Sequence, residues 1–355
     1  MNNSSNKNKK HASLLFYVHH HGEGHISRAR LLVPTLATVY RVVIVFIDPK
    51  VANKLSKYSD SVEFQQLPSK WATRSGCDER MYCSAFEGIE FSRAPLERAI
   101  EFNAIVKEFR PICFISDVSA ELTIAARSIG LPVLMQRHSG DISGDPTQVF
   151  AYECASKLYA PFPKYLEATS YKYNDKTHYL NFISKYSSVP SHREEENTSD
   201  VTILMNDPER AAVIAKICTE IAGRVVVIGC EGRKIDNVVW KGRVSDISMS
   251  IDTALVITSC GNNAVSELLS LRKRIIVIPE NRPYGEQLEK AKMLHKRGLA
   301  IYLPWKDFIN QRIDTVREAL KNATRINSEG ARSLFDHPEV YASKFLSLVK
   351  EIACE

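Results

Sequence analysis

The strongest constraint on the fold is a short polar turn, Cys260–Ala264, set between two apolar runs. The run Ala254–Ile257 predicts a buried strand, Ala264–Leu271 predicts a helix, and Ile275–Ile278 predicts a second strand. A turn that enters a helix in this way presents free backbone N–H groups, which suit an anion such as a phosphate. Gly261 allows the backbone to approach such a ligand closely. An ordinary capped turn of a parallel sheet has the same pattern, so the turn alone leaves both interpretations open.

Length and composition limit the class of protein. With 355 residues the chain is too long for one core of ordinary size, so we expect two domains. The net charge of +6 suits anionic ligands or a weak attraction to an anionic membrane surface, but it is too small to indicate a nucleic-acid partner. Eight cysteines without a CxxC pair are typical of reduced thiols in a cytosolic protein. The sequence has no signal-peptide pattern and no apolar run of membrane-spanning length, so we expect a cytoplasmic protein with a disordered tail over residues 1–12.

A glycine-containing turn, Gly22-Glu23-Gly24-His25, follows the first predicted strand. Residues 14–47 around it are typical of a strand–helix–strand unit. One interpretation is a dinucleotide fingerprint, in which Gly22 and Gly24 approach a pyrophosphate and Asp48 binds a ribose. Another is that His25 faces the crevice above the sheet and acts as a general base on an incoming hydroxyl. A capping or packed histidine is the third interpretation, and all three remain open.

Further polar residues follow the first-half strands. The strand predicted over Ile112–Ser116 ends at Asp117, on the same edge of the sheet as His25. An aspartate there could fix the tautomer of His25 and stabilise its imidazolium, or it could cap the next helix. The triplet His19–His21 raises the question of a metal, but no carboxylate or cysteine stands at ligand spacing beside it. We therefore favour packing or hydrogen bonding for the triplet and expect no metal site.

Two loops of the first half are candidates for binding a second substrate. Loop Arg137–Gln148 leaves the same edge of the sheet and brings His138 and Asp141 towards the expected site. Loop Leu67–Arg93 is irregular and carries four aromatic side chains among charged residues. An acceptor-binding or membrane-apposed loop and a loop packed on its own aromatic residues are both compatible with this composition.

The first half ends with two further predicted strands, Lys157–Ala160 and Tyr179–Ile183, and the second half repeats the alternation of strands and helices. A polar stretch, Ser184–Asp200, separates the two halves and marks the predicted domain boundary. The pattern predicts the α/β fold class, with two parallel, doubly wound domains. The amphipathic segment Val340–Ala353, within residues 336–355, is expected to return as a terminal helix and brace the first domain.

Three segments resemble motifs of a known family: the turn Gly22–His25, the turn Ser259–Glu267, similar to a donor motif written SxGGxxTxxE, and the segment Pro279–Gln287, similar to a P…EQ motif. The chain resembles GT-B nucleotide-sugar glycosyltransferases, most of all the peptidoglycan N-acetylglucosaminyltransferase type with a family 28-like donor domain. The resemblance is strongest over residues 238–303. It implies two Rossmann-like domains facing across a cleft, with residues 13–190 binding the acceptor and residues 191–335 the nucleotide sugar.

The resemblance also implies roles for single residues. His25 would be the catalytic base and Asp117 its partner. Glu267 would bind the nucleotide ribose, and Glu286 and Gln287 would contact the donor sugar. The diphosphate is expected at Cys260, Gly261, Asn262, Asn263 and Ala264, the base, commonly uracil, at Gly242, Arg243 and Val244, and the acceptor beside Gly22, Glu23, Gly24, His138 and Asp141.

Two positions depart from the family pattern. The glycine-rich turn after the first donor-domain strand is replaced by Asn206-Asp207-Pro208, which puts that phosphate contact in question. The second glycine of the donor turn is replaced by Asn262. Both changes are compatible with the fold and leave the choice of donor open.

The function implied is an inverting, metal-independent transfer of a sugar from a nucleoside diphosphate sugar, expected to be UDP-linked, to a hydroxyl acceptor. No cofactor is expected besides this co-substrate. A lipid-linked sugar, a glycan and a small metabolite remain open as acceptors, as does peripheral contact with the inner face of the membrane. The alternatives are a nucleotide-sugar hydrolase or 2-epimerase on the same fold, a nicotinamide-dependent oxidoreductase using Gly22, Gly24 and Asp48, and a non-catalytic nucleotide-sugar-binding protein.

Overall fold

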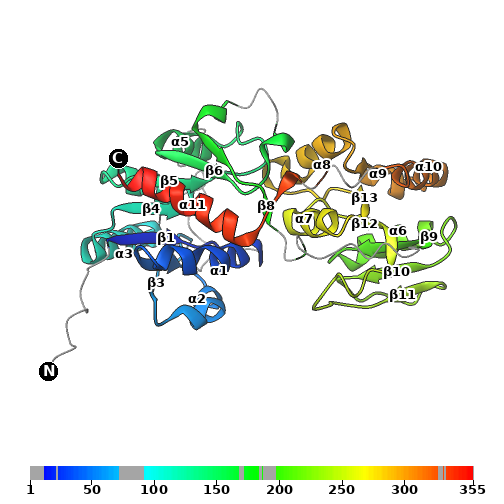
Figure 1. Ribbon diagram of the computed structural model, residues 1–355, viewed down its shortest axis with the longest axis horizontal. Helices are drawn as coiled ribbons and strands as arrows, with labels where there is room; N and C mark the ends of the chain where they lie inside the picture. The colour runs from blue at the N-terminus through cyan, green and yellow to red at the C-terminus, as the bar shows by residue number, and fades with distance from the viewer. Residues whose placement is uncertain are drawn as a thin grey trace.

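The computed structural model describes residues 12–20, 23–71, 92–167, 172–183, 186, 197–326, 331 and 333–354. Figure 1 shows two lobes, each built around a parallel sheet with helices beside it. The predicted α/β class with two doubly wound units is confirmed. The exact limits of the two domains stay a prediction. Residues 1–11 of the expected tail and residues 72–91 of the loop Leu67–Arg93 lie outside the described residues.

The first sheet has seven strands in the order β3-β2-β1-β4-β5-β6-β7, all paired in parallel. Alternate side chains of β1 enter two apolar clusters on opposite faces of the sheet, Leu14 and Phe16 on one, Leu15 and Tyr17 on the other. Burial on both faces explains the continuous apolar runs of these strands. The strands are β1 (Ser13–Tyr17), β2 (Arg41–Phe46), β3 (Val62–Gln66), β4 (Cys113–Ser116), β5 (Val133–Gln136), β6 (Lys157–Ala160) and β7 (Thr177–Tyr179).

The second sheet has the order β11-β10-β9-β12-β13-β14, again with parallel pairings only. In both sheets the chain starts at a central strand, builds outwards to one side, and then returns to build the other side. The order therefore reverses between β1 and β4 and between β9 and β12. The strands are β9 (Asn197–Leu204), β10 (Val225–Ile228), β11 (Val238–Trp240), β12 (Thr253–Thr258), β13 (Arg274–Val277) and β14 (Ile301–Tyr302).

Helices connect the strands on both faces of each sheet. They are α1 (Glu23–Ala37), α2 (Lys50–Leu55), α3 (Arg93–Phe109), α4 (Ala120–Ser128), α5 (Pro146–Cys154), α6 (Pro208–Cys218), α7 (Asn262–Ser270), α8 (Glu286–Lys296), α9 (Trp305–Ile309), α10 (Ile313–Ala323) and α11 (Pro338–Ala353), with short 3₁₀ turns η1 (Ser56–Tyr58), η2 (Lys164–Leu166), η3 (Asn174–Lys176) and η4 (Pro283–Gly285). Among the described residues, no helix combines the length and apolar content needed to cross a bilayer.

The structure corrects the sequence expectations at two places. The loop expected over Arg137–Gln148 is shorter, because α5 begins at Pro146 and Asp145 caps it by accepting a hydrogen bond from Gln148 N at 3.1 Å. The single strand expected over Tyr179–Ile183 is wrong. Its first residue ends β7, and its last two form β8 (Phe182–Ile183), which pairs with β15 (Phe335–Asp336) in a separate two-stranded sheet.

The terminal helix α11 returns to the first lobe, where Figure 1 shows it in red across the strands. Its Tyr341, Phe345 and Val349 belong to the same apolar cluster as residues of β1 and α1. The β8–β15 pair lies where the chain crosses between the lobes, and Asn181 Nδ2 donates a hydrogen bond to Asp336 Oδ1 there at 3.3 Å.

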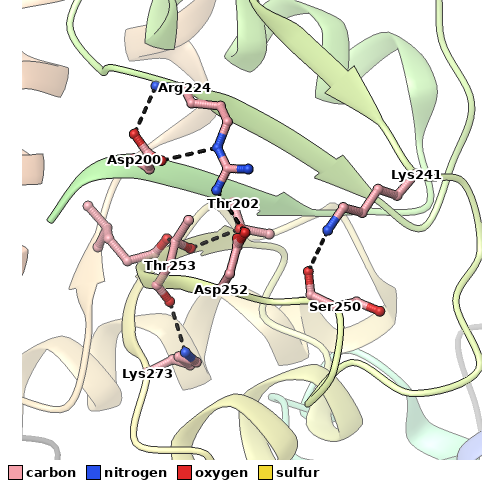
Figure 2. Close-up of polar contacts among 9 residues, drawn as sticks. Asp200, Thr202, Arg224, Lys241, Ser250, Asp252, Thr253 and Lys273 are labelled. Carbon is pink, nitrogen blue, oxygen red and sulfur yellow. Dashed lines mark hydrogen bonds and ion pairs between the residues drawn. The ribbon is translucent and has the colours of Figure 1, made fainter. Parts of the chain in front are cut away.

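Charged and hydroxyl side chains gather at the amino ends of the second sheet's strands (Figure 2). Arg224 Nε lies 3.1 Å from Asp200 Oδ2, and Arg224 Nη2 lies 2.8 Å from Asp252 Oδ2. Buried behind them, Thr253 Oγ1 donates to Thr202 Oγ1 at 2.8 Å. A further buried cation, that of Lys273, donates to the backbone oxygen of Thr253 at 2.9 Å. We call Asp200, Thr202, Arg224, Asp252, Thr253 and Lys273 the amino-edge cluster.

Candidate active site

The carboxyl ends of β1 and β4 lie side by side at the point where the strand order of the first sheet reverses. The connections that leave these two strands run to opposite sides of the sheet, which is where open α/β sheets bind their ligands. His25 lies in the first turn of α1, which follows β1, and Asp117 directly follows β4. The topology therefore brings together two residues that are 92 positions apart.

His25 Nδ1 lies 2.8 Å from both carboxylate oxygens of Asp117. The carboxylate is 3% exposed, and it also accepts a hydrogen bond from the amide of His19 at 3.2 Å. Burial alone would raise the pKa of Asp117, but His25, Arg28 and the His19 amide together lower it. An ionised carboxylate only accepts hydrogen bonds, so we assign the proton to Nδ1 of His25, which leaves the lone pair on Nε2.

A network of polar side chains lies next to the His25–Asp117 pair. Arg28 Nη1 lies 4.0 Å from Asp117 Oδ1 and donates to Gln136 Oε1 at 2.7 Å. The same Gln136 oxygen accepts a hydrogen bond from the Tyr159 hydroxyl at 3.1 Å. Arg28, in the helical turn after His25, and Gln136, the last residue of β5, were missed in the sequence, where no motif distinguishes them from other polar residues.

His138 follows β5 on the same edge. Burial, with smaller contributions from the neighbouring His25 and Arg137, lowers the pKa of His138 to about 4, so its imidazole is neutral at physiological pH. Its Nε2 is buried without a hydrogen-bond partner among the described residues. Its amide donates to the Tyr152 hydroxyl at 2.6 Å, and its carbonyl accepts from Arg137 Nε at 2.7 Å. The loop thus holds an imidazole nitrogen that a ligand could satisfy.

The second sheet offers two helix N-termini at its own reversal point, and they differ. At α6, which follows β9, the Asp207 carboxylate accepts hydrogen bonds from the amides of Glu209 and Arg210 at 3.0 and 3.1 Å. At α7, which follows β12, the capping residue is Gly261 with ordinary φ of −68°, and no side chain caps the helix. The α6 end is already filled by a carboxylate, whereas the α7 amides are open to an anion.

Two side chains of α8, Gln287 and Lys290, hold the turn before α7 in place. Gln287 Oε1 accepts hydrogen bonds from the amides of Cys260 at 3.1 Å and Glu280 at 2.8 Å. Lys290 Nζ, also buried, donates to the Cys260 carbonyl at 3.0 Å. Burial raises the pKa of the Cys260 thiol to about 11, so the turn carries no thiolate. Cys260 contributes backbone rather than side chain, and Gln287 uses its carbonyl for this turn while its contact with a donor sugar stays a prediction.

The other donor residues expected from the sequence lie around α7. Asn262 Oδ1 is buried and has no hydrogen-bond partner among the described residues, and Glu267 lies one turn into the helix, half-buried. Gly242 has φ of +61°, a conformation that favours glycine, and its carbonyl accepts from Gly229 N at 2.7 Å. Arg243 beside it is exposed.

The two lobes meet at these turns. A side chain added at Gly24, beside His25, would lie 3.5 Å from Oδ1 of Asn263 in the α7 turn. The amide of Asp141 donates to the carbonyl of Tyr284 at 2.9 Å. His25, Asp117 and His138 are therefore close to the open end of α7. Ala264 and Glu286 belong to α7 and α8, which border this region, whereas Gly22 and the side chain of Glu23 lie outside the described residues.

The residues that suggested other chemistries have local partners. Asp48, the expected ribose ligand of a dinucleotide site, accepts a hydrogen bond from Lys50 N at the start of α2. The rings of His19 and His20 stack with centroids 5.0 Å apart, and His21 lies outside the described residues. Within the described part of the chain, no group of three or more His, Cys, Asp or Glu side chains is arranged to hold a metal ion.

Comparisons with known proteins bear on this site. Residues 245–350 match the model of the glycosyltransferase family 28 C-terminal domain, a range that includes α7 and α8. A relative from Streptococcus gordonii, named UDP-N-acetylglucosamine--N-acetylmuramyl-(pentapeptide) pyrophosphoryl-undecaprenol N-acetylglucosamine transferase, is 26% identical over 261 residues, which cover 63% of this chain and 71% of the relative. A protein of the same name from Streptococcus agalactiae is 26% identical over 229 residues, which cover 57% of this chain and 61% of that protein.

Solved structures extend the likeness over nearly the whole chain. MurG of Acinetobacter baumannii aligns with a TM-score of 0.66 at 12% identity, covering 96% of this chain and 99% of that one. The spinosyn rhamnosyltransferase SpnG, complexed with thymidine diphosphate, aligns with a TM-score of 0.61 at 16% identity, covering 95% and 99%. At these identities the likeness establishes the fold, and the two-lobed architecture is that of these structures.

Proposed function

We propose a reaction for this chain from the premise that it is a glycosyltransferase of the GT-B fold. It resembles the peptidoglycan N-acetylglucosaminyltransferases, and its residues 245–350 match the family 28 C-terminal domain. The proposed reaction is the transfer of a sugar from a UDP-linked donor to a hydroxyl acceptor, with inversion and without a metal ion. UDP-N-acetylglucosamine is the first donor to test, because the names of the relatives specify it.

One observation carries the proposal. The His25–Asp117 pair and the uncapped N-terminus of α7 come from different lobes, yet Gly24 and Asn263 bring them into contact range. A base oriented by a carboxylate then faces a site suited to a diphosphate, which is the arrangement that a displacement at an anomeric carbon requires.

The proposed chemical step is a single displacement. Nε2 of His25 takes the proton of the acceptor hydroxyl while the acceptor oxygen bonds to the anomeric carbon. The bond from that carbon to the diphosphate oxygen breaks, and its electron pair leaves with the diphosphate. Asp117 holds the His25 ring and stabilises the imidazolium that forms, because its carboxylate is held ionised at 2.8 Å from Nδ1.

The donor half of the site is proposed around α7. The amides at its N-terminus would bind the diphosphate directly, whereas the buried Asn262 Oδ1, which only accepts hydrogen bonds, would be linked to it through a water molecule. Glu267 would bind the ribose, Gly242–Val244 the base, and Glu286 the sugar. Since helix dipole and backbone N–H groups stabilise the departing negative charge, the proposal needs no metal ion.

The acceptor half is proposed at His138, whose unpartnered Nε2 and neutral ring suit a hydrogen bond to a sugar hydroxyl. The relatives' names specify an acceptor carried on undecaprenol, a lipid. With the net charge of +6, this supports a lipid-linked sugar as acceptor and peripheral contact with the cytoplasmic face of the membrane.

The test is UDP release from UDP-N-acetylglucosamine with a panel of lipid-linked sugars, glycans and small alcohols. His25→Ala should lower turnover about 10²–10⁴-fold while calorimetry shows unchanged UDP affinity. His178→Ala, on the outer strand β7, is the matched control and should retain activity. A loss confined to UDP binding would remove His25 from its proposed role. Equal UDP release without any acceptor would identify a hydrolase instead, and loss of activity with a chelator would contradict the metal-free step.

A further inference from the structure

Tyr284 makes an unusual contact between the two lobes. It lies in η4, between β13 and α8 of the second lobe, and reaches the loop that follows β5 in the first. Its own φ is +61°, a left-handed backbone conformation that residues other than glycine rarely adopt. Such backbone strain persists only where surrounding contacts hold it, and it clusters at functional sites.

The backbone part of this contact leaves no room for a side chain at Gly140. The Tyr284 carbonyl accepts the hydrogen bond from Asp141 N at 2.9 Å, and a Cβ added to Gly140 would lie only 2.1 Å from that carbonyl oxygen. Gly140 has no left-handed backbone that would itself require glycine. The approach of Tyr284 is therefore what excludes a side chain at this buried position.

The side chain of Tyr284 makes a second set of contacts. Its hydroxyl donates to Asp145 Oδ2 at 2.7 Å, while Asp145 Oδ1 caps α5 through Gln148 N. Its ring lies 4.6 Å from that of His138, centroid to centroid. One residue of the donor lobe thus touches the backbone, the helix cap and the imidazole of the proposed acceptor loop.

The residues after Tyr284 connect this contact to the donor turn. Helix α8 begins two residues later at Glu286, and Gln287 Oε1 holds the amide of Cys260, directly before the uncapped end of α7. A displacement of Tyr284 relative to Gly140 would therefore move Glu286 and the diphosphate turn relative to His138 and His25.

We propose that Tyr284 is a positioning residue that sets the donor-sugar segment Glu286–Gln287 against the acceptor loop, and so fixes the distance between donor and acceptor. This inference rests on the proposed function of the site. It places the donor sugar between Glu286 of the second lobe and the acceptor loop of the first, so disturbing the contact should weaken recognition of the sugar. Recognition of the nucleotide should stay intact, since the α7 turn and Gly242–Val244 lie within one lobe.

The chain provides a matched pair of variants for the test. Gly140→Ala forces the Tyr284 carbonyl away by about 1 Å, whereas Gly144→Ala, in the same loop, adds a methyl group where no atom lies within 4 Å. Tyr284→Phe keeps the ring and removes the hydroxyl with its hydrogen bonds, including the one to Asp145. Tyr58→Phe is its control, since the Tyr58 hydroxyl donates to Arg30 O within the first lobe.

Calorimetry with UDP and with UDP-N-acetylglucosamine separates nucleotide from sugar. In Gly140→Ala we expect the Kd for UDP-N-acetylglucosamine to rise about tenfold, and in Tyr284→Phe about threefold, with UDP affinity within about twofold of wild type. Both controls should match wild type. Hydrogen exchange adds a ligand-free readout, because the Asp141 amide should be protected in wild type and Gly144→Ala but not in Gly140→Ala.

Each outcome decides something different. Unchanged affinity for both ligands in Gly140→Ala, or an equal loss of both, would overturn the positioning role. An unprotected Asp141 amide in wild type would show that the contact is not held in solution and would overturn it as well. Failure of wild type to bind UDP would instead overturn the proposed function, and the exchange data would then still report on the contact itself.

Discussion

The two edges of the second sheet carry polar residues of the same kinds but use them differently. At the amino edge, Arg224 binds two carboxylates and Lys273 binds a buried carbonyl, so the charges of the amino-edge cluster are compensated within the lobe (Figure 2). At the carboxyl edge, the α7 N-terminus has no side-chain cap and Asn262 Oδ1 has no partner among the described residues.

The difference separates stability from function. A buried polar group without a partner costs free energy, so it persists at the carboxyl edge only where something else satisfies it, whether a ligand or water. At the amino edge, by contrast, the charged side chains of Arg224 and Lys273 already have hydrogen-bond partners within the lobe. We therefore expect changes at the carboxyl edge to alter ligand affinity and changes at the amino edge to alter only the free energy of unfolding.

The largest effect is expected from closing the open helix end. Gly261→Asp would place a carboxylate at α7, as Asp207 does at α6, and a Cβ there meets no atom within 4 Å. The new cap would occupy the amides proposed for the diphosphate and repel it. UDP affinity should fall about 10²–10⁴-fold, the effect of losing two charge-assisted hydrogen bonds.

Calorimetry with UDP measures this change, and Gly261→Ala, which adds no cap and no charge, should bind UDP nearly as wild type does. If Gly261→Asp bound UDP normally, the open α7 end would not be the phosphate site and the contrast with α6 would lose its functional meaning.

At the carboxyl edge of the first sheet, the burial of His138 should make the free energy of unfolding depend on pH. The pKa of His138 is lowered from 6.5 to about 4, so between these values the unfolded chain binds a proton that the folded chain does not. The free energy of unfolding should therefore fall as the pH drops from about 6.5 to about 4, by at most about 3 kcal/mol from this residue.

Chemical denaturation between pH 4.5 and 7.5 tests this linkage. His138→Gln keeps a polar side chain but does not titrate, so its stability should depend less on pH than that of wild type. The same slope in both proteins would mean that His138 is not held neutral at this edge.

A smaller effect is expected one turn into α7. Glu267→Ala should weaken UDP binding by about 1–3 kcal/mol, or about 5–150-fold, through loss of the proposed ribose contact. Glu289→Ala, on the exposed face of α8 where Glu289 pairs with Lys292, removes the same charge and should leave UDP affinity unchanged. Equal affinities in both variants would take Glu267 out of the site.

How far the sequence predicted this arrangement depends on how local each feature is. The α7 turn could be predicted because strand, turn and helix lie within Ala254–Leu271. The capping position is occupied by Gly261, which has no side chain to cap the helix. His25 and Asp117 lie far apart, but each follows a recognisable parallel strand, so their shared edge could be predicted while their 2.8 Å contact required the fold.

The contacts between lobes were not predictable. The sequence around Tyr284 and Gly140 carries no motif for their contact, because nothing in the local sequence reports that a carbonyl from another lobe fills the space beside Gly140. Asp207 shows a third case. The sequence shows a departure from a glycine-rich turn, and the structure supplies its physical consequence, since the carboxylate now occupies the helix end.

The smallest effect should come from the amino edge. Arg224→Ala removes the ion pairs with Asp200 and Asp252, but its side chain is 44% exposed, so solvent screening limits the loss in free energy of unfolding to about 1 kcal/mol. Chemical denaturation in low and high salt should show a loss that shrinks with salt, and Arg317→Ala, which removes an exposed pair on α10, should show almost none. UDP affinity should not change in either variant. A fall in UDP affinity on removing Arg224 would mean that the amino edge also supports the ligand, and the separation of the two edges would fail.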